Sequence, residues 1–148
     1  MKAVDLFCGI GGMRIAAERE GFETIFSSDI DEGARKIYFD NFGDLPRGDI
    51  RDIESTEIPA HNLLLAGFPC QPFSNSGKRL GFEDTRGTLF FEIARILEDK
   101  SPEFVLLENV KGLVGHDSGR TFRRIVGVMA DLGYSTSTAV LNARDFGL

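Results

Sequence analysis

The sequence predicts an α/β fold with a mostly parallel sheet and helices on both of its faces. Short apolar runs alternate with amphipathic stretches along all 148 residues, a pattern typical of βαβ units. No internal repeat, low-complexity tract or long linker interrupts this alternation. The length suits one domain, and a hydrophobic content of 42% with 13 Phe is sufficient for a core. We therefore expect one domain that covers residues 1–148.

The first half of the chain predicts two strand–helix units. Apolar runs favour two buried strands, and a cluster of glycines after the first run predicts a tight turn. Asp31 has the side chain of a helix N-cap, and the apolar residues after it have helical spacing. The expected elements are a strand at residues 3–7, a turn at 8–12, a helix at 13–20 closed by Gly21, a strand at 23–28, and a helix from Asp31 to about Asn41.

The second half of the chain continues the alternation around one long polar loop. Residues 71–87 are rich in Gly, Ser and charged side chains and predict this loop. The expected elements are a strand at residues 62–66, a helix at 88–99, a strand at 103–107, a helix at 119–132 and a final strand at 135–141.

Four segments with unusual side chains come directly after predicted strands. They are residues 8–12, 29–31, 68–70 and 108–109. In a parallel α/β sheet, ligands bind beyond the carboxyl ends of the strands. We therefore expect these four segments to form one site at one edge of the sheet.

The charge balance argues against a small, purely electrostatic nucleic-acid binder. The chain has 17 Lys+Arg and 23 Asp+Glu, a net charge of −6, whereas such a binder needs clustered basic side chains. Residues 1–60 hold 7 basic and 13 acidic side chains, and residues 61–148 hold 10 of each. An anionic partner is therefore expected at the second part of the chain.

The cysteine count and the hydropathy pattern predict a reduced, cytoplasmic protein. Cys8 and Cys70 are too few for a disulfide framework and lack the spacing of metal ligands, so we expect no metal site. Asp5 and the glycines after it break the apolar N-terminus, which argues against a signal peptide. No run reaches the ~18 apolar residues of a membrane span, so we expect no membrane partner.

The glycine-rich turn and a later aspartate indicate a nucleoside-containing cofactor. Asp29 follows Gly9 by 20 residues and ends the second predicted strand, where a carboxylate can accept hydrogen bonds from two ribose hydroxyls. A tight turn followed by a helix-capping aspartate is the alternative. Arg14 stands where a dinucleotide-binding turn has its third glycine, so an adenosyl cofactor without phosphates fits better. Asp49 could end a third strand and meet the adenine amino group, or it could be a solvated turn aspartate.

A cysteine and a glutamate at neighbouring strand ends suggest covalent catalysis. Prolines on both sides of Cys70 prevent a helix and stiffen its loop, although a buried structural cysteine is the commoner case. Glu108 directly follows an apolar run, so we expect it to be poorly solvated and able to donate a proton near neutral pH. Cys8 lies in the cofactor turn, and we expect it to pack rather than react.

Five segments match ordered motifs of one enzyme family. They are residues 5–12 (DLFCGIGG), 67–74 (GFPCQPFS), 84–91 (DTRGTLFF), 108–110 (ENV) and 140–147 (VLNARDFG). In this order and spacing, the chain closely resembles the N-terminal catalytic part of bacterial DNA cytosine-5 methyltransferases. The resemblance spans nearly the whole chain, and it implies a Rossmann-like sheet that binds S-adenosyl-L-methionine.

The resemblance implies roles for individual residues. The Cys70 thiolate would add to carbon 6 of a cytosine flipped out of the duplex, and Glu108 would protonate its N3. The cofactor would lie against Phe7, Gly9, Ile10, Gly11, Gly12, Asp29, Ile30, Asp49, Ile50, Pro69 and Leu89. Double-stranded DNA would be contacted by Gln71, Ser74, Ser76 and Arg86; for Arg86, an ordinary solvated loop is an equal alternative. A restriction–modification system and a nucleoid-associated location in a bacterium are further expectations.

The chain departs from the family pattern at two places. Many relatives carry an aromatic residue over the adenine where this chain has Ile30, which puts the cofactor affinity in question. The family also continues beyond the last matched motif into further active-site residues and a target-recognition domain. We therefore expect an incomplete sheet and an isolated chain that is inactive, with a complementing C-terminal fragment or second subunit as a possible partner.

Two other functions remain open from the sequence. An RNA cytosine-5 methyltransferase would use the same cysteine and glutamate. A non-catalytic nucleotide-binding fragment, related to a dehydrogenase, would bind NAD and have no use for Cys70.

Overall fold

The fold is described from a computed structural model, which covers residues 1–69 and 89–147 in describable detail. Contacts within the chain divide it into two compact units, residues 1–109 and residues 110–148. The predicted loop at residues 71–87, and with it Cys70, Gln71, Ser74, Ser76 and Arg86, lies outside the described residues. Within the described part of the chain, no helix combines the length and the apolar character needed to cross a membrane.

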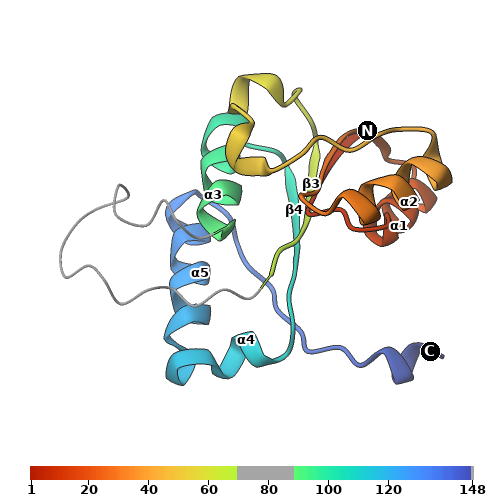
Figure 1. Cartoon of the computed structure of the whole chain (residues 1–148). Coiled ribbons are helices and arrows are strands. Elements are labelled where there is room, and N and C mark those ends of the chain that lie inside the picture. Colours follow the sequence, from red (N-terminus) through yellow and green to blue (C-terminus); the bar gives the residue numbers. More distant parts are fainter. Residues whose placement is uncertain (70–88, 148) are drawn as a thin grey trace. The chain divides into compact units, whose positions relative to one another are not determined.

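The first unit is built on a parallel sheet (Figure 1). The strands run in the order β2-β1-β3-β4, and every ladder between neighbours is parallel. Both outer strands therefore flank a central pair that is buried on both faces, as expected of a parallel sheet. The strand bounds are β1 (Lys2–Leu6), β2 (Glu23–Ser28), β3 (Leu63–Gly67) and β4 (Phe104–Glu108).

Helices cover the two faces of this sheet. In Figure 1, α1 and α2 lie on one side of β3 and β4, and α3 lies on the other. Right-handed crossovers account for the separation of α1 from α3, because β1→β2 and β3→β4 cross the sheet in opposite directions. The helix bounds are α1 (Gly12–Arg19), α2 (Glu32–Phe42) and α3 (Leu89–Lys100), and one-turn 3-10 helices lie at Ile50–Asp52 and Ser55–Glu57.

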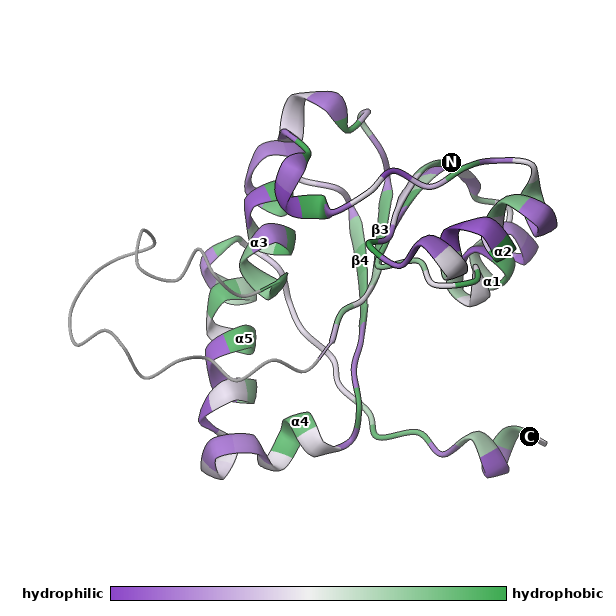
Figure 2. Ribbon diagram, in the orientation of Figure 1, coloured by the Kyte–Doolittle hydropathy of each residue, from purple (hydrophilic) through white to green (hydrophobic). Residues whose placement is uncertain are grey.

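Alternate residues of the central strands supply the two layers of the core. On one face, Ala3, Leu63 and Leu65 pack with Ala17 of α1. Val4, Leu6 and Leu64 are also buried but point to the opposite face, because successive strand residues alternate. The apolar stripe of α3 supplies Phe90, Phe91, Ile93, Ala94, Ile96 and Leu97. Figure 2 shows α3 with green apolar segments beside purple polar ones.

The second unit contains the remaining helices. A one-turn helix α4 (Gly112–Gly115) leads through a 3-10 turn (His116–Gly119) into α5 (Arg120–Asp131), and a further 3-10 turn spans Ala143–Phe146. The buried side of α5 consists of Thr121, Ile125, Val128 and Met129.

Two predicted strands do not form. Residues 135–141 alternate in polarity weakly, have no regular secondary structure and are exposed throughout. An extended segment becomes a strand through a hydrogen-bonded neighbour, which its own sequence does not supply. Asp49 does not end a third strand either: the segment before it forms a single isolated bridge between Ser28 and Arg47. The remaining strands and helices lie within about two residues of their predicted bounds.

Candidate active site

The turn after β1 has an unusual backbone. Phe7, Gly9 and Gly11 all have positive φ angles, of 54°, 53° and 95°. A left-handed conformation at a bulky residue such as Phe7 is strained, and such strain persists where the surroundings impose it. The turn is anchored by the Cys8 amide, which donates to the Ser28 carbonyl at 3.1 Å, and by the Gly11 amide, which donates to the Cys8 carbonyl at 2.9 Å.

The glycines of this turn serve different purposes. A Cβ atom on Gly11 would overlap the ring of Phe42, so packing between the turn and α2 requires a glycine there. At Gly9 and Gly12, by contrast, an added Cβ would meet nothing within 4 Å. These two positions leave open space beside the backbone, which is what close approach of a ligand needs.

Asp29 is held against this turn from the end of β2. Its Oδ2 accepts a hydrogen bond from the Gly9 amide at 2.8 Å, and its Oδ1 accepts one from the Asp31 amide at 2.8 Å. The helix cap is a different residue: Asp31 accepts from the Ala34 amide at 2.7 Å. Asp29 is therefore an oriented acceptor at the turn rather than the cap of α2. Its neighbour Ile30 is 65% exposed.

Strand β1, which leads into the turn, contains a buried carboxyl group for which no role was predicted. The Asp5 side chain is 1% exposed, and neither carboxyl oxygen has a hydrogen-bond partner among the described residues. Burial raises the pKa of Asp5 to about 7, the nearby Arg14 opposes this rise, and Asp29 adds to it. Burial likewise raises the pKa of the Cys8 thiol, which agrees with a packing role for this cysteine.

Arg14, at the position of the missing third glycine, joins α1 to α2. Its guanidinium donates to Glu18 at 2.7 Å and to the Tyr38 hydroxyl at 3.2 Å, and it pairs with Asp44 at 3.3 Å. It also lies 4.4 Å from the centre of the Phe42 ring, a cation–π contact. A long side chain at this position therefore packs against the neighbouring helix, where a dinucleotide-binding turn has a glycine for helix–strand packing.

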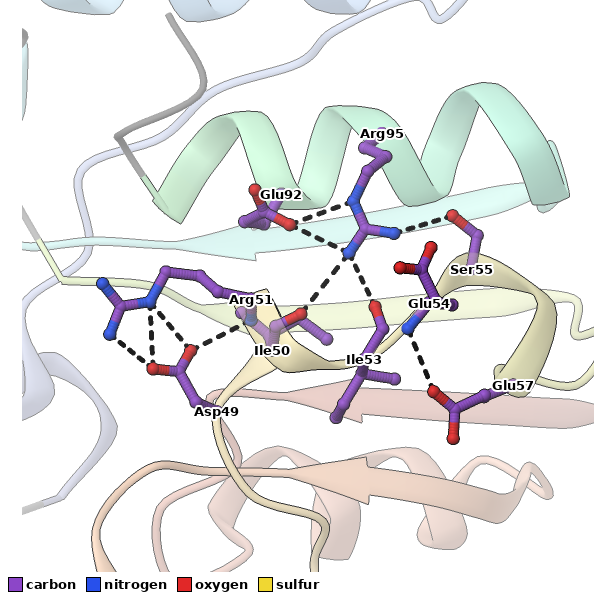
Figure 3. Close-up of polar contacts among 9 residues, drawn as sticks. All are labelled: Asp49, Ile50, Arg51, Ile53, Glu54, Ser55, Glu57, Glu92 and Arg95. Atoms are coloured by element: carbon purple, nitrogen blue, oxygen red, sulfur yellow. Dashed lines mark hydrogen bonds and ion pairs between the residues drawn. The ribbon is translucent and has the colours of Figure 1, made fainter.

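Asp49 and Ile50 begin the irregular segment that follows α2. The Asp49 carboxylate caps the first 3-10 turn by accepting from the Arg51 amide at 3.0 Å, and it also pairs with the Arg51 guanidinium (Figure 3). The hydrogen bonds from Arg51 hold the pKa of Asp49 below its usual value. Ile50 is 3% exposed, so its side chain belongs to the core. Asp49 therefore lies in a turn, as one of the two interpretations of the sequence predicted, and its carboxylate is held in place by Arg51.

The ends of β3 and β4 lie side by side. Gly67 pairs with Glu108 in the parallel ladder, and a Cβ on Gly67 would come within 3.5 Å of the Glu108 carboxylate. Glu108 is exposed, which corrects the prediction of a poorly solvated side chain: strand β4 is an edge strand, and alternate residues along it are exposed. Pro69, next to Cys70, is also exposed.

Asn109 connects these two strand ends. Its Nδ2 donates to the Phe68 carbonyl at 2.6 Å, two residues before Cys70. Phe68 is buried and packs against Phe90 of α3, with ring centroids 5.8 Å apart. Sequence analysis placed Asn109 in a motif without assigning it a contact. A polar side chain directly after Glu108 was the available signal.

The predicted site residues fall into three groups. Within the turn, Gly9 binds Asp29 directly, and the strand ends bring Glu108 opposite Gly67. Asp49 and half-buried Leu89, the first residue of α3, lie on other segments of the first unit. Among the described residues, no group of three or more His, Cys, Asp or Glu side chains is arranged to hold a metal ion.

Comparison with known proteins identifies close relatives. The Type II methyltransferase M.NgoBI of Neisseria gonorrhoeae is 58% identical over 147 residues, which cover 99% of this chain and 46% of the relative. The Type II methyltransferase M.HhaI of Haemophilus parahaemolyticus is 49% identical over 148 residues, covering 100% and 45%. Among solved structures, the S. pombe Dnmt2 methyltransferase has a TM-score of 0.68 at 26% identity, covering 88% of this chain and 42% of that one.

The structural match agrees with the parallel sheet described above. The chain spans a little under half the length of M.NgoBI and M.HhaI. A family model for C-5 cytosine-specific DNA methylases matches residues 1–148. The fold, the ordered motifs and this match over the whole chain lead to one conclusion: the chain belongs to the C-5 cytosine-specific DNA methylase family.

Proposed function

We propose that this chain carries the cofactor-binding and catalytic residues for transfer of a methyl group from S-adenosyl-L-methionine to carbon 5 of cytosine in DNA. The observation that supports this most directly is the pairing of the β3 and β4 ends. There Glu108 lies opposite Gly67, and Asn109 binds the carbonyl of Phe68, two residues before Cys70. A catalytic pair on two neighbouring strand ends suits a covalent mechanism.

The residues of the turn fit an adenosyl cofactor. Gly9 and Gly12 leave open space at the backbone, and the Asp29 carboxylate, held by two amides, keeps lone pairs for ribose hydroxyls. When bound, S-adenosyl-L-methionine supplies an electrophilic methyl group. Phe7, Ile10, Ile30 and Pro69 would contact it, together with Leu89, the Asp49 carboxylate and the backbone of Ile50.

The chemistry of the protein residues follows from the electronics of cytosine. The Cys70 thiolate forms a bond to carbon 6, and Glu108 gives a proton to N3, so that the electron pair moves to carbon 5. Carbon 5 would take the methyl group that bound S-adenosyl-L-methionine supplies, which leaves S-adenosylhomocysteine, and would then lose its proton to solvent while the N3 proton returns to Glu108. The Cys70–carbon 6 bond breaks, which restores the thiolate and releases 5-methylcytosine. The base must leave the duplex to reach these residues, and Gln71, Ser74, Ser76 and Arg86 would contact the DNA.

The experiment that tests this proposal is covalent trapping. DNA that contains 5-fluorocytosine has no proton to lose at carbon 5, so the adduct with Cys70 persists. With protein residues beyond position 148 supplied in the same chain or by a complementing chain, we expect a protein–DNA adduct that requires S-adenosyl-L-methionine and is absent in Cys70→Ser. If RNA that contains 5-fluorocytosine forms the adduct in preference to DNA, the substrate is RNA and the RNA methyltransferase alternative holds. Binding of NAD, with no adduct on either nucleic acid, would favour the nucleotide-binding alternative.

We further propose that methyl transfer requires protein residues beyond these 148. The chain spans under half of its close relatives, and residues 61–148 carry no excess of basic side chains for holding a duplex. The missing contribution would come from a longer chain or from a second, complementing chain. Labelled methyl transfer to DNA by the purified 148-residue chain, lost in Cys70→Ser, would overturn this proposal.

A further inference from the structure

The segment that carries Asp49 has little regular structure of its own. It consists of two 3-10 turns, Ile50–Asp52 and Ser55–Glu57, and neither belongs to the sheet. The buried side chains of Ile50, Ile53 and Ile58 attach it to the core. Hydrogen bonds from Arg51 orient the Asp49 carboxylate within the segment. Apolar contacts are non-directional, so they do not by themselves fix how the backbone of the segment is placed relative to α3.

Arg95 of α3 supplies directional contacts to this segment. Its Nη2 donates to the carbonyl of Ile53 at 2.9 Å and to the carbonyl of Ile50 at 3.4 Å, and its Nη1 donates to the Ser55 hydroxyl at 2.8 Å. Figure 3 shows the guanidinium reaching from the helix between the two 3-10 turns. These contacts join residues 40 to 45 positions apart in the sequence.

Glu92 fixes the orientation of this guanidinium. One carboxylate oxygen of Glu92 accepts from Arg95 Nε at 3.0 Å and lies 2.9 Å from Nη2. The Glu92 side chain is 15% exposed, so the pair is sheltered from solvent. A planar guanidinium held at one edge presents its remaining N–H groups in a fixed fork. Arg95 is therefore oriented before it binds the segment.

The position of Arg95 relates two parts of the proposed cofactor site. Leu89 begins the same helix, less than two turns before Arg95, and Asp49 directly precedes Ile50, whose carbonyl Arg95 binds. The guanidinium thus sets the placement of the Asp49 end of the segment relative to α3. Loss of the Arg95 guanidinium would leave the side chains of Ile50, Ile53 and Ile58 buried, but the carbonyls of Ile50 and Ile53 would lose their hydrogen bonds to α3.

We propose that Arg95 is a positioning residue that fixes the Asp49 carboxylate for the 6-amino group of adenine, and so makes the chain selective for an adenosyl over an inosyl ligand. This inference rests on the proposed function, in which Asp49 meets the adenine. An amino group donates to a carboxylate, whereas the carbonyl of hypoxanthine cannot. The selectivity therefore depends on where the carboxylate is held.

The test compares two ligands on the 148-residue chain by calorimetric titration. The ligands are S-adenosylhomocysteine and its inosine analogue, and the variants are Arg95→Met, Arg95→Lys and Asp49→Asn. Lys100→Met is the matched control, because Lys100 lies on the same helix and pairs with Asp99 instead of with the segment. We expect the wild type and the control to prefer the adenosyl ligand about tenfold, the effect of one charge-assisted hydrogen bond.

The ratio of the two affinities separates positioning from general damage. If Arg95 had only a structural role, its loss would weaken the binding of both ligands equally. We expect instead that Arg95→Met and Asp49→Asn each reduce the ratio of the adenosyl to the inosyl affinity below about threefold. Arg95→Lys keeps the charge but lacks the forked N–H groups, so its affinity ratio is expected to lie between those of the wild type and Arg95→Met. A wild-type ratio retained in both Arg95 variants would overturn the inference. Failure of the wild type to bind either ligand would instead count against the proposed function.

Discussion

At the scale of single residues, the buried carboxyl group of Asp5 makes the stability of the fold depend on pH. Its pKa is raised from 3.8 to about 7 by burial. The folded chain therefore keeps a proton that the unfolded chain releases near pH 4. Stability falls as the pH rises through this interval, because the unfolded state then binds fewer protons.

We predict that Asp5→Asn removes this pH dependence. Well below pH 4 both side chains are neutral in the folded and the unfolded chain, so the free energies of unfolding should be similar. By pH 8 the variant should be the more stable, by on the order of 4 kcal/mol for a shift of about 3 pKa units. Urea denaturation at several pH values measures the difference. A constant difference between the two proteins would show that Asp5 does not titrate in this range.

Asn109 offers a second prediction at this scale. Asn109→Ala removes the donor to the Phe68 carbonyl, and Asn62→Ala is the matched control, because it removes the acceptor of the Lys2 amide at the opposite end of the sheet. Each should lower the free energy of unfolding by about 1 kcal/mol. Under conditions that support methyl transfer, we expect only Asn109→Ala to slow trapping by 5-fluorocytosine DNA. Equal trapping rates in both variants would limit Asn109 to a structural role.

At the scale of elements, the sequence predicts those strands and helices whose formation depends on the spacing of apolar and capping residues along the chain. Apolar runs and caps locate β1, α2 and α3 because burial and capping follow from spacing along the chain. The strand expected at residues 135–141 fails because pairing depends on a neighbour. Arg95 escapes prediction for a related reason: its partners lie 40 to 45 residues away, in a segment without periodicity. The predicted buried strand at residues 3–7 implies that Asp5 is buried, but whether its carboxyl finds a hydrogen-bond partner depends on contacts that the sequence does not show.

The turn before α1 allows a matched pair of substitutions. Gly11→Ala should destabilise the fold by about 1–3 kcal/mol, because it combines a positive φ with a clash against Phe42. At Gly12 an added Cβ would meet nothing within 4 Å and φ is not positive, so Gly12→Ala should leave the stability of the fold unchanged. We predict instead that Gly12→Ala weakens binding of S-adenosylhomocysteine, since its methyl group occupies space left for the ligand. Thermal unfolding and titration together check both expectations, and unchanged affinity in Gly12→Ala would place the ligand elsewhere.

At the scale of the whole molecule, the net charge of −6 takes on a specific meaning. The excess of acidic side chains lies in residues 1–60, which include Asp29 and Asp49 of the proposed cofactor site. S-adenosyl-L-methionine carries a sulfonium charge that S-adenosylhomocysteine lacks. A negative field around the site attracts the first ligand more than the second, and salt screens this attraction when the charges are exposed.

We therefore predict that salt changes the preference between these two ligands. Raising the ionic strength from ~0.05 M to ~0.5 M shortens the Debye length from above 10 Å to below 5 Å. The affinity for S-adenosyl-L-methionine should fall by about threefold relative to that for S-adenosylhomocysteine, as measured by parallel titrations. The two ligands share their adenine, ribose and amino-acid parts, so each serves as the control for the other. Parallel loss of both affinities would mean that the acidic residues support the fold of the first unit without attracting the sulfonium.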